Sequence, residues 1–284
     1  MQRYRTVSEL RAVLDPARAR GQRIGLVGTS GGMHEGHQSL IRTAAAENDV
    51  AALYWGGAPS ADLSWRSGST ITYERDPEHD FPLAEEAGCD ILFAPDGDLM
   101  FPIEPMTTVA IPAMSSGIPT MEDPAHLDLI ALAMCKLWNM FGPCRNYFGE
   151  KDWQQLAMFT RVAAELAFPV DVLGCPTIRE DDGVAVSSRN AQLTAEERAV
   201  APVLYRALCA SRDAALAGTR TIAEVQKVFA EVIGDVATIQ YFAVVDGPTM
   251  QPLDDLAGSV RVLASIELGS VRLLDNVGIE LPEA

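Results

Sequence analysis

Short apolar runs alternate with amphipathic helical patterns in the first part of the chain, and this alternation limits the folds that are open to it. The runs consist of β-branched or apolar residues and end near Gly, Pro or aromatic residues, as buried strands do. They are RIGLVG (23–28), VAALYW (50–55), DILFAP (90–95) and VDVLG (170–174). Segments with apolar residues at intervals of three and four, which predict helices, lie at 36–47, 80–87, 126–141 and 152–167. This order predicts an α/β fold with a parallel, doubly wound sheet.

The pattern changes after the segment SSRN at 187–190. Thr194, followed three residues later by Glu197, forms a capping box, which predicts a long helix to about Ala217. Another helix is expected near 222–234. The closing segments IQYFAVVD, VRVLASIEL and SVRLLDN predict three strands joined by short turns.

A chain of 284 residues is long enough for two domains. We expect an α/β domain over residues 1–180 and a small α+β domain over residues 181–284. The boundary is expected in the segment 176–187, where the pattern of alternating strands and helices ends.

Charge and composition exclude several classes of function. A formal net charge of -17 would repel a nucleic-acid backbone over most of the surface, so an anionic ligand needs a local cationic pocket. Five cysteines without a C-x-x-C pair favour reduced thiols and a cytoplasmic location. The most apolar segment, 127–141, is interrupted by Asp128 and Lys136 and is too short to cross a membrane. The N-terminus has no apolar signal-peptide core, so no membrane association is expected.

The segment GLVGTSGGMHEGHQSL (25–40) allows two different chemistries. Its first half matches G-x-S-x-G, the turn that exposes a nucleophilic serine in α/β-hydrolases, with Ser30 in the serine position. That turn needs a helix directly after the serine, but Gly31, Gly32 and Gly36 delay helix formation. The order Ser, acid, His also needs a late histidine, and the last one here is His126. A hydrolase is therefore disfavoured.

The second chemistry is an anion site. A glycine-rich loop lets backbone amides approach an anion, and the helix that begins near Gly36 directs its N–H groups and positive dipole end to the same point. His34 and His37 project to one side of the first helical turn. They could donate hydrogen bonds to phosphate oxygens or bind a metal, although no further His or Cys lies at metal-ligand spacing. The alternative, a pair of solvated capping histidines, remains open from this segment alone.

Two further segments supply cations and hydroxyls. YFGEKDWQQL (147–156) places Lys151 and Asp152 at a strand-to-helix turn, the edge at which open α/β sheets bind ligands. Each segment has a structural interpretation by itself, because Lys151 could pair with Asp152, and Ser187 and Ser188 of the second segment could cap a helix. Together they suit a polyphosphate in an acidic protein. The second segment, PTIREDDGVAVSSRN (176–190), contributes Arg179, Ser187, Ser188 and Arg189.

These motifs resemble those of the pantoate–β-alanine ligase family, in family order and over nearly the whole chain. The segments concerned are HEGH, YERDPEHD (73–80), MFP (100–102), YFGEKDWQQL, PTIREDDGVAVSSRN and VRLLDN (271–276). The resemblance implies a Rossmann-like nucleotidyltransferase domain with an H-x-G-H motif, and a smaller C-terminal domain that closes over ATP. It also implies a homodimer that takes a small carboxylic acid and an amine as substrates.

In such a ligase the acid's carboxylate attacks the α-phosphate of Mg-ATP, and an amine then opens the acyl adenylate. The resemblance assigns the phosphate-directed catalytic donors to His34, His37, Lys151 and Arg189. It assigns nucleotide binding to Thr29, Gly31, Gly36, Gly149, Asp152, Ser187 and Ser188, with Asp152 toward the ribose. Substrate binding falls to Gln155, Ser30, Gly56 and Pro59. Mg²⁺ would be held by phosphate oxygens and waters, without a dedicated protein site.

The chain departs from the family pattern around the acid. Where the family has Pro-Thr-Met-Gly, this chain has Gly28-Thr29-Ser30-Gly31. Where the family has Phe-Val-Asn-Pro-x-Gln, this chain has Gly56 in place of Asn, Gly57 in place of Pro and Pro59 in place of Gln. The helix that usually begins Arg-Pro-Gly-His-Phe begins Asp-Pro-Ala-His-Leu at 123–127, and Leu129 replaces a glycine. The glutamine at Gln155 is retained. We expect an intact nucleotide half and an altered acid half.

Three explanations fit these departures. A ligase that kept adenylation but changed its acid is the simplest, because a buried hydrogen-bond partner is worth ~1 to 3 kcal/mol and several are lost together. A true pantoate–β-alanine ligase with substitute contacts is the second. The third, a non-catalytic nucleotide-binding homologue, is disfavoured by the intact HEGH, Lys151 and Arg189.

Overall fold

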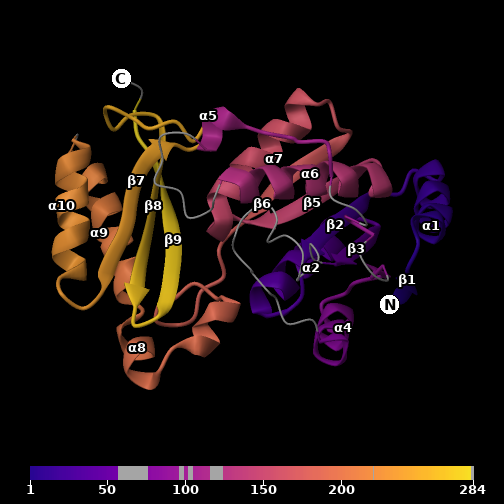
Figure 1. Cartoon of the computed structure of the whole chain (residues 1–284), viewed down its shortest axis with the longest axis horizontal. Coiled ribbons are helices and arrows are strands. Elements are labelled where there is room, and N and C mark those ends of the chain that lie inside the picture. The colour runs from indigo at the N-terminus through magenta and orange to yellow at the C-terminus, as the bar shows by residue number, and fades with distance from the viewer. Residues whose placement is uncertain (57–75, 96–98, 102–104, 116–123, 220, 283–284) are drawn as a thin grey trace. The chain divides into compact units, whose positions relative to one another are not determined.

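The chain forms two compact units. The computed structural model describes all residues except 57–75, 96–98, 102–104, 116–123, 220 and 283–284, which Figure 1 draws in grey. Unit 1 comprises Met1–Ile111, Glu122–Glu150 and Met158–Pro176. Unit 2 comprises Pro112–Met121, Lys151–Ala157 and Thr177–Ala284. Two segments from within the first predicted domain thus belong to unit 2.

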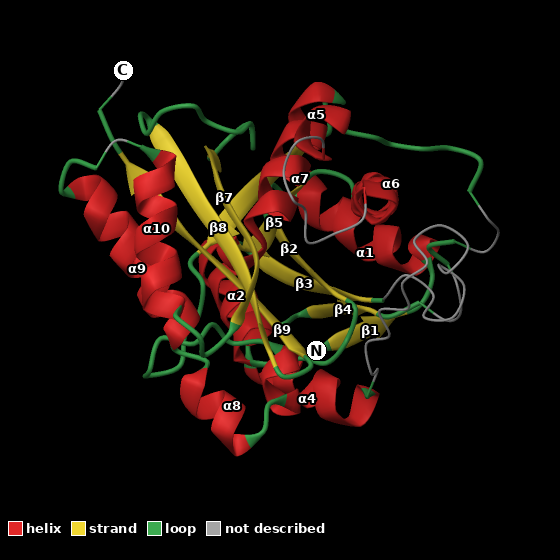
Figure 2. Ribbon diagram, turned by 60° about the vertical axis from the view of Figure 1, so that its left-hand side comes forward, coloured by secondary structure: helices red, strands yellow, loops and turns green. Residues whose placement is uncertain are grey.

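Unit 1 is built on a six-stranded parallel sheet, which confirms the predicted α/β class. Its strands are β1 (Gln2–Tyr4), β2 (Ile24–Thr29), β3 (Val50–Trp55), β4 (Ile91–Phe93), β5 (Cys144–Gly149) and β6 (Val170–Cys175). They lie in the order β1-β4-β3-β2-β5-β6, and every pair is parallel (Figure 2). From β2 the chain builds outward through β3 and β4, and later returns to add β5 on the other side of β2. The strand order therefore reverses between β2 and β5, where open α/β sheets bind ligands outside the carboxyl ends of the strands.

Helices cover both faces of this sheet. They are α1 (Val7–Ala19), α2 (Glu35–Glu47), α4 (Pro77–Glu86), α6 (Pro124–Phe141) and α7 (Trp153–Glu165), the last of which contributes its second part to unit 1. Leu53 and Trp55 of β3 pack with α2 and α4 on one face. Phe93 of β4 meets Phe141 of α6 on the other, with ring centroids 5.8 Å apart. No helix in the described ranges is long and apolar enough to cross a membrane.

Unit 2 has a three-stranded antiparallel sheet with helices along one side (Figure 1). Its strands are β7 (Thr238–Asp246), β8 (Ser259–Leu268) and β9 (Val271–Glu280), paired in that order. Its helices include α5 (Pro112–Ser115), α8 (Ala195–Val200), α9 (Val203–Leu216) and α10 (Ile222–Ile233). Phe229 of α10 and Leu208 of α9 are fully buried in a core shared with Val262 and Ile266 of β8. The three predicted C-terminal strands are thereby confirmed.

Two predictions for unit 2 were wrong in detail. The single long helix expected from Thr194 to about Ala217 is divided into α8 and α9. Pro202, which has no N–H and crowds the preceding turn, stands at the division. The turn between β7 and β8 is also longer than expected, because it spans 247–258, whereas Gly269 and Ser270 alone join β8 to β9.

All five cysteines are free thiols, and four of them are buried. Burial raises the pKa of the Cys89 and Cys144 thiols to about 12. The scattered cysteines are therefore packed side chains, and the described part of the chain contains no disulfide.

Candidate functional site

The loop between β2 and α2 lies at the carboxyl edge of the sheet, beside the point where the strand order reverses. Thr29 is the last residue of β2, and Gly149 is the last residue of β5, the neighbouring strand. A Cβ atom at Gly149 would meet no atom within 4 Å, so this backbone is open to a ligand. Both positions belong to unit 1, and their placement agrees with the general location of nucleotide sites in open α/β sheets.

His34 caps the N-terminus of α2. Its backbone is extended, with φ -146° and ψ 178°, and its Nδ1 accepts a hydrogen bond from the N–H of Gly36 at 3.1 Å. A nitrogen that accepts carries no proton, so the neutral imidazole holds its proton on Nε2. His34 can therefore act as a donor through Nε2 while Nδ1 orients the ring.

His37 is tied to the same loop. Its Nδ1 accepts from the N–H of His34 at 3.4 Å, and its Nε2 lies 3.3 Å from Oγ1 of Thr29. In the neutral tautomer that follows, Nε2 donates to Thr29. The two imidazole centroids are 4.2 Å apart. In this arrangement His37 orients His34 and Thr29, whereas the sequence suggested a second donor aimed at phosphate.

The glycine-loop amides have acceptors within the protein, contrary to the expectation that they would face an anion. The N–H of Gly31 donates to Oγ1 of Thr29 at 3.2 Å. The N–H groups of Gly32 and Met33 donate to the carboxylate of Asp80 at 3.1 and 2.8 Å. The loop conformation is thus fixed by the side chains of Thr29 and Asp80.

Small residues line the edge where the acid is expected. The N–H of Gly56, directly after β3, donates to the carbonyl of Thr29 at 3.0 Å, next to Ser30. A Cβ at Gly56 would lie 2.5 Å from Cζ and from the hydroxyl oxygen of Tyr54. The Tyr54 ring therefore occupies the space into which a side chain at 56 would project. Pro59, also predicted to bind substrate, lies outside the described residues.

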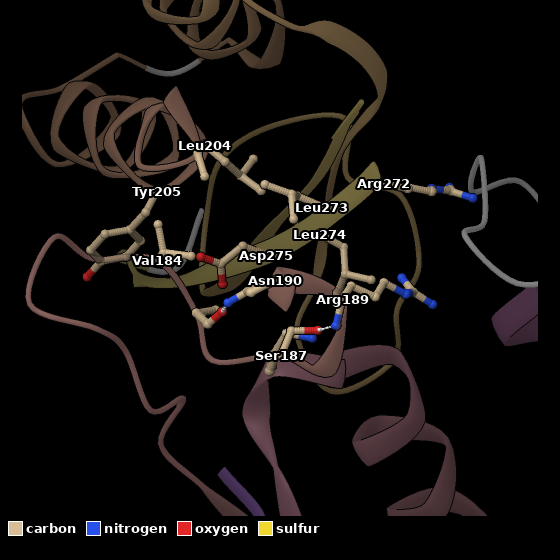
Figure 3. Close-up of a pocket in the computed structure, with 13 residues that line it drawn as sticks. Val184, Ser187, Arg189, Asn190, Leu204, Tyr205, Arg272, Leu273, Leu274 and Asp275 are labelled. Atoms are coloured by element: carbon tan, nitrogen blue, oxygen red, sulfur yellow. Dashed lines mark hydrogen bonds between the residues drawn. The ribbon is translucent and has the colours of Figure 1, made fainter. Parts of the chain in front are cut away.

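Unit 2 contains a second cluster of predicted site residues, shown in Figure 3. Arg189 and Arg272 point to the same side of the cluster, away from Tyr205. The enclosed volume is about 20 Å³, room for about one water, so these residues form a wall and not a closed nucleotide pocket. The lining includes the predicted Lys151, Ser187 and Arg189, together with Asn190, Tyr205, Arg272 and Asp275.

Hydrogen bonds within unit 2 hold Lys151 in this cluster. Nδ2 of Asn276, a buried residue of β9, donates to the backbone carbonyl of Lys151 at 2.8 Å. Nε1 of Trp153 donates to the carbonyl of Gly247 at 2.8 Å, and the guanidinium of Arg261 lies 3.5 Å from the centroid of its ring. The backbone at Lys151 is therefore fixed, and the residue is part of the lining of the cluster.

The structure assigns Arg179 a structural role, which corrects the sequence interpretation. Its guanidinium forms a two-pronged ion pair with Asp275, at 2.5 and 3.0 Å, and lies 3.6 Å from the ring centroid of Tyr205. Asp275 is 3 % exposed. Because Arg179 is already neutralised, Lys151 and Arg189 remain as the predicted cations that the cluster presents.

Of the remaining predicted residues, Ser187 is part of the lining of the cluster, and the others lie beside it in the sequence. Ser187 caps a 3-10 helix (Ser188–Gln192), and its Oγ accepts from the N–H of Arg189 at 3.3 Å, the dashed line in Figure 3. Ser188 begins that helix and is exposed. Asp152 and Gln155 lie on the turn and helix that follow Lys151, outside the lining of the cluster. Their predicted roles toward ribose and acid stay predictions.

The sequence interpretation gave no role to several residues that hold the site. Asp80 lay in the quoted segment YERDPEHD, and Asp275 and Asn276 in VRLLDN, but neither segment received a chemical function. A signal was present in the second case, since an acidic residue and an amide stand together inside an apolar strand pattern, and buried polar groups need partners. Trp55, Asn190 and Arg272 carried no such signal.

The described residues contain no group of three His, Cys, Asp or Glu side chains that could hold a metal ion. The carboxylate of the unit 2 cluster, Asp275, is engaged by Arg179. The donor set at Lys151 and Arg189 is cationic, which suits phosphate and not a divalent cation.

The comparison with known families decides the identity. The family model described as Pantoate-beta-alanine ligase matches residues 2–278. The chain belongs to the pantoate–β-alanine ligase family. This confirms the resemblance drawn from the motifs, and it makes the protein an ATP-dependent acid–amine ligase that forms a C–N bond.

Relatives of this ligase match over almost their full length. The chain is 44% identical to pantothenate synthetase 1 of Frankia alni, covering 98% of each chain. It is 40% identical to the pantothenate synthetase of Geobacillus kaustophilus, covering 98% of this chain and 92% of the relative. The crystal structure of pantothenate synthetase from Thermus thermophilus superimposes with a TM-score of 0.85 at 36% identity, covering 98% of this chain and 99% of that one. The ligase therefore has the fold of pantothenate synthetases.

Proposed function

We propose that this ligase adenylates a small carboxylic acid and passes the acyl group to an amine, with an acid specificity altered from pantoate. In the first step a carboxylate oxygen bonds to the α-phosphorus of Mg-ATP, the bond to the bridging oxygen breaks, and pyrophosphate leaves. In the second step the amine nitrogen bonds to the acyl carbon, a proton is released and AMP departs. Mg²⁺ would enter with ATP, held by phosphate oxygens and waters, because the cationic donor set at Lys151 and Arg189 suits phosphate.

The protein's contribution to the first step is electrostatic. Negative charge builds on the α-phosphate and on the departing pyrophosphate, and donors aimed at those oxygens are worth ~2 to 4 kcal/mol each in a dry site. His34 supplies an Nε2–H whose direction is set by the bond from Gly36 to Nδ1. Lys151 and Arg189 supply charged donors, and Ser187 a hydroxyl, from unit 2. His37 would act chiefly by orienting the His34 ring.

The observation that carries the altered acid specificity is the contact between Gly56 and Tyr54. The family pattern places an asparagine and a glutamine after β3, and this chain has Gly56 and Pro59 there. Because the Tyr54 ring lies where a side chain at 56 would project, an asparagine at this position would require the ring to move. A site that loses hydrogen-bond partners for a substrate hydroxyl loses its preference for that substrate by ~10⁴-fold or more.

A second candidate is the ordinary family reaction, the joining of pantoate to β-alanine. The family match and the names of the relatives favour it. The Francisella tularensis pantoate-beta-alanine ligase, described as complexed with Beta-gamma ATP and Beta-alanine, shares the fold at a TM-score of 0.74 and 24% identity. For this reaction, other groups would have to replace the side-chain amides that the family has at positions 56 and 59.

ATP–pyrophosphate exchange separates the candidates. Exchange is measured with pantoate beside a panel of small carboxylic acids, followed by competition among amines for the adenylate. Fastest exchange with another acid supports the proposal, whereas efficient exchange with pantoate and rapid amide formation with β-alanine would refute it in favour of the second candidate. No exchange with any acid would indicate a non-catalytic, nucleotide-binding homologue.

Alanine variants test the assigned donors in the same assay. Replacing His34, Lys151 or Arg189 should lower the exchange rate by about 10²- to 10³-fold while the fold is retained. Arg198→Ala is the matched control in unit 2, because Arg198 pairs with Glu180 and Asp182 and does not line the cluster. If all three variants exchange at the wild-type rate, the proposed catalytic roles of His34, Lys151 and Arg189 are refuted.

We also propose that the ligase is a cytoplasmic homodimer, in line with its free thiols and its family. Light scattering at high micromolar concentration should report twice the mass of 30.6 kDa. A monomer at that concentration would contradict the homodimer.

A further inference from the structure

Asp80 is a carboxylate of α4 with no exposed surface. Its Oδ1 accepts from the N–H of Met33 at 2.8 Å. Its Oδ2 accepts from the N–H of Gly32 at 3.1 Å and from Nε1 of Trp55 at 2.7 Å. Nδ1 of His79 lies 3.0 Å from Oδ1. One side chain thus connects α4 and the end of β3 to the loop between β2 and α2.

This position requires an ionised carboxylate. Three N–H donors and an imidazole converge on it, and an ionised carboxylate is a pure acceptor with sites for about four hydrogen bonds. An asparagine would offer one acceptor oxygen and turn an NH₂ group toward a donor. Burial alone would raise the pKa of Asp80, but the hydrogen bonds from Trp55, His79 and Met33 outweigh it and hold the pKa below the ordinary 3.8. The side chain is therefore charged at neutral pH.

The loop that Asp80 holds has a conformation that needs support. Gly31 and Gly32 have φ values of 107° and 62°, in the left-handed region that favours glycine. Two such residues in succession are flexible, and ordering them costs conformational entropy. The amides of Gly32 and Met33 are the last two before His34, the N-cap residue of α2. Fixing these two amides therefore fixes the point from which the His34 imidazole projects.

We propose that Asp80 is a positioning residue for adenylation, which holds the His34 imidazole in place through the backbone of Gly32 and Met33. This inference rests on the proposed role of His34 as a donor to ATP. Asp80 acts through the loop and has no contact with substrate. A merely structural Asp80 would join α4 to β3, and its loss would weaken the fold without a specific effect on the imidazole.

The first test is Asp80→Asn, which keeps the shape of the side chain. We expect kcat of ATP–pyrophosphate exchange, measured with the fastest acid of the panel, to fall about 10²-fold, with KM for ATP changed less than about threefold. The matched control is Asp90→Asn. The Asp90 carboxylate also accepts from a backbone N–H, that of Ala51 at 2.9 Å, but at the opposite end of β3. The control should exchange at the wild-type rate.

Combination with His34→Ala separates positioning from general stabilisation. If Asp80 acts through His34, Asp80→Asn should cost little once the imidazole is gone, and the two effects will not add. Equal fold-losses in both backgrounds would overturn the proposal. Full activity of His34→Ala alone would refute the proposed role of His34, whereas an inactive His34→Ala with a folded, fully active Asp80→Asn would refute only the positioning role.

A readout without turnover keeps the inference testable whatever the acid. Backbone amide hydrogen exchange at Gly32 and Met33 should be about 10-fold faster in Asp80→Asn and unchanged in Asp90→Asn. If Asp80→Asn does not fold, Trp55→Phe removes one of the donors and leaves the charge. It should accelerate the same amides and lower kcat by about 3- to 10-fold. Unchanged protection of these amides in folded variants would overturn the proposal.

Discussion

Replacement of Gly36 by alanine tests how closely the His34 imidazole must be placed. A Cβ at 36 would lie 2.8 Å from Cε1 and 3.0 Å from Nδ1 of His34. To reach the 3.4 Å of an ordinary contact, the ring would have to retreat by about 0.6 Å. The retreat would also lengthen the 3.1 Å hydrogen bond from the N–H of Gly36 to Nδ1. A side chain at Gly36 would therefore displace the imidazole of His34.

Gly36→Ala should lower the rate of adenylation strongly but change the stability of the fold little. A misplacement of about 1 Å at a reacting group can cost about 10²-fold in rate, and a weakened hydrogen bond about 1 kcal/mol. We expect kcat of ATP–pyrophosphate exchange to fall about 10- to 100-fold. An alanine within a helix is better than glycine by about 0.5 to 1 kcal/mol, which offsets the strain. The free energy of unfolding should therefore change by less than about 1 kcal/mol.

The assay compares exchange kinetics and urea unfolding on the same preparations of Gly36→Ala. Thr43→Ala, two turns along α2, is the matched control, because it also introduces a better helix former and the Thr43 hydroxyl donates to the carbonyl of Ser39, away from Gly36. The control should retain the wild-type rate. A Gly36→Ala variant with wild-type kcat would refute the reasoning, since it would mean that the ring position does not limit adenylation.

Ser30→Ala should lower the rate of exchange far less than His34→Ala does, and a serine-hydrolase probe that labels Ser30 would instead support a nucleophilic serine. Asp80→Asn should destabilise the protein by about 2 to 4 kcal/mol at pH 7. Because the folded pKa of Asp80 is depressed, its contribution is present above the unfolded pKa near 3.8 and is lost as the pH falls through the folded value. The free energies of unfolding of the wild type and Asp80→Asn, measured with urea, should therefore converge as the pH falls below about 4. A difference that does not change with pH would contradict this sign. Arg179→Met should lower the free energy of unfolding by about 3 to 5 kcal/mol, because it leaves Asp275 buried and unpaired, and the Arg179→Met/Asp275→Leu double variant should recover most of it.

Elements with strong periodicity were predictable from the sequence, and those set by distant contacts were not. The strands at 50–55 and 170–174 and the helix at 36–47 appear within a residue or two of their predicted ends. Pro202 indicates the division of the long helix, but the Ala and Leu pattern around it favours one continuous helix. The short β1 has too few residues for any period and exists because it pairs with β4.

The candidate site shows the same limit. The histidines of HEGH and the cations Lys151 and Arg189 were predicted from their types and spacing. The residues that hold these side chains in place were not predicted, because a sequence does not reveal which carboxylate will accept from which backbone amide. Asp80 lies 47 and 48 residues from the amides it accepts from. Arg179 looked like a phosphate ligand until its partner, 96 residues away, was known.

The buried thiols have a practical consequence for labelling. Thiolates and not thiols react with maleimides and iodoacetamide, and the pKa of about 12 at Cys89 and Cys144 leaves almost no thiolate at neutral pH. Burial also raises the pKa of Cys135 and Cys175. Cys209 is the one cysteine that is not buried. In a Cys209→Ser background, a maleimide dye could therefore be attached at one introduced cysteine in either unit without removing the interior cysteines.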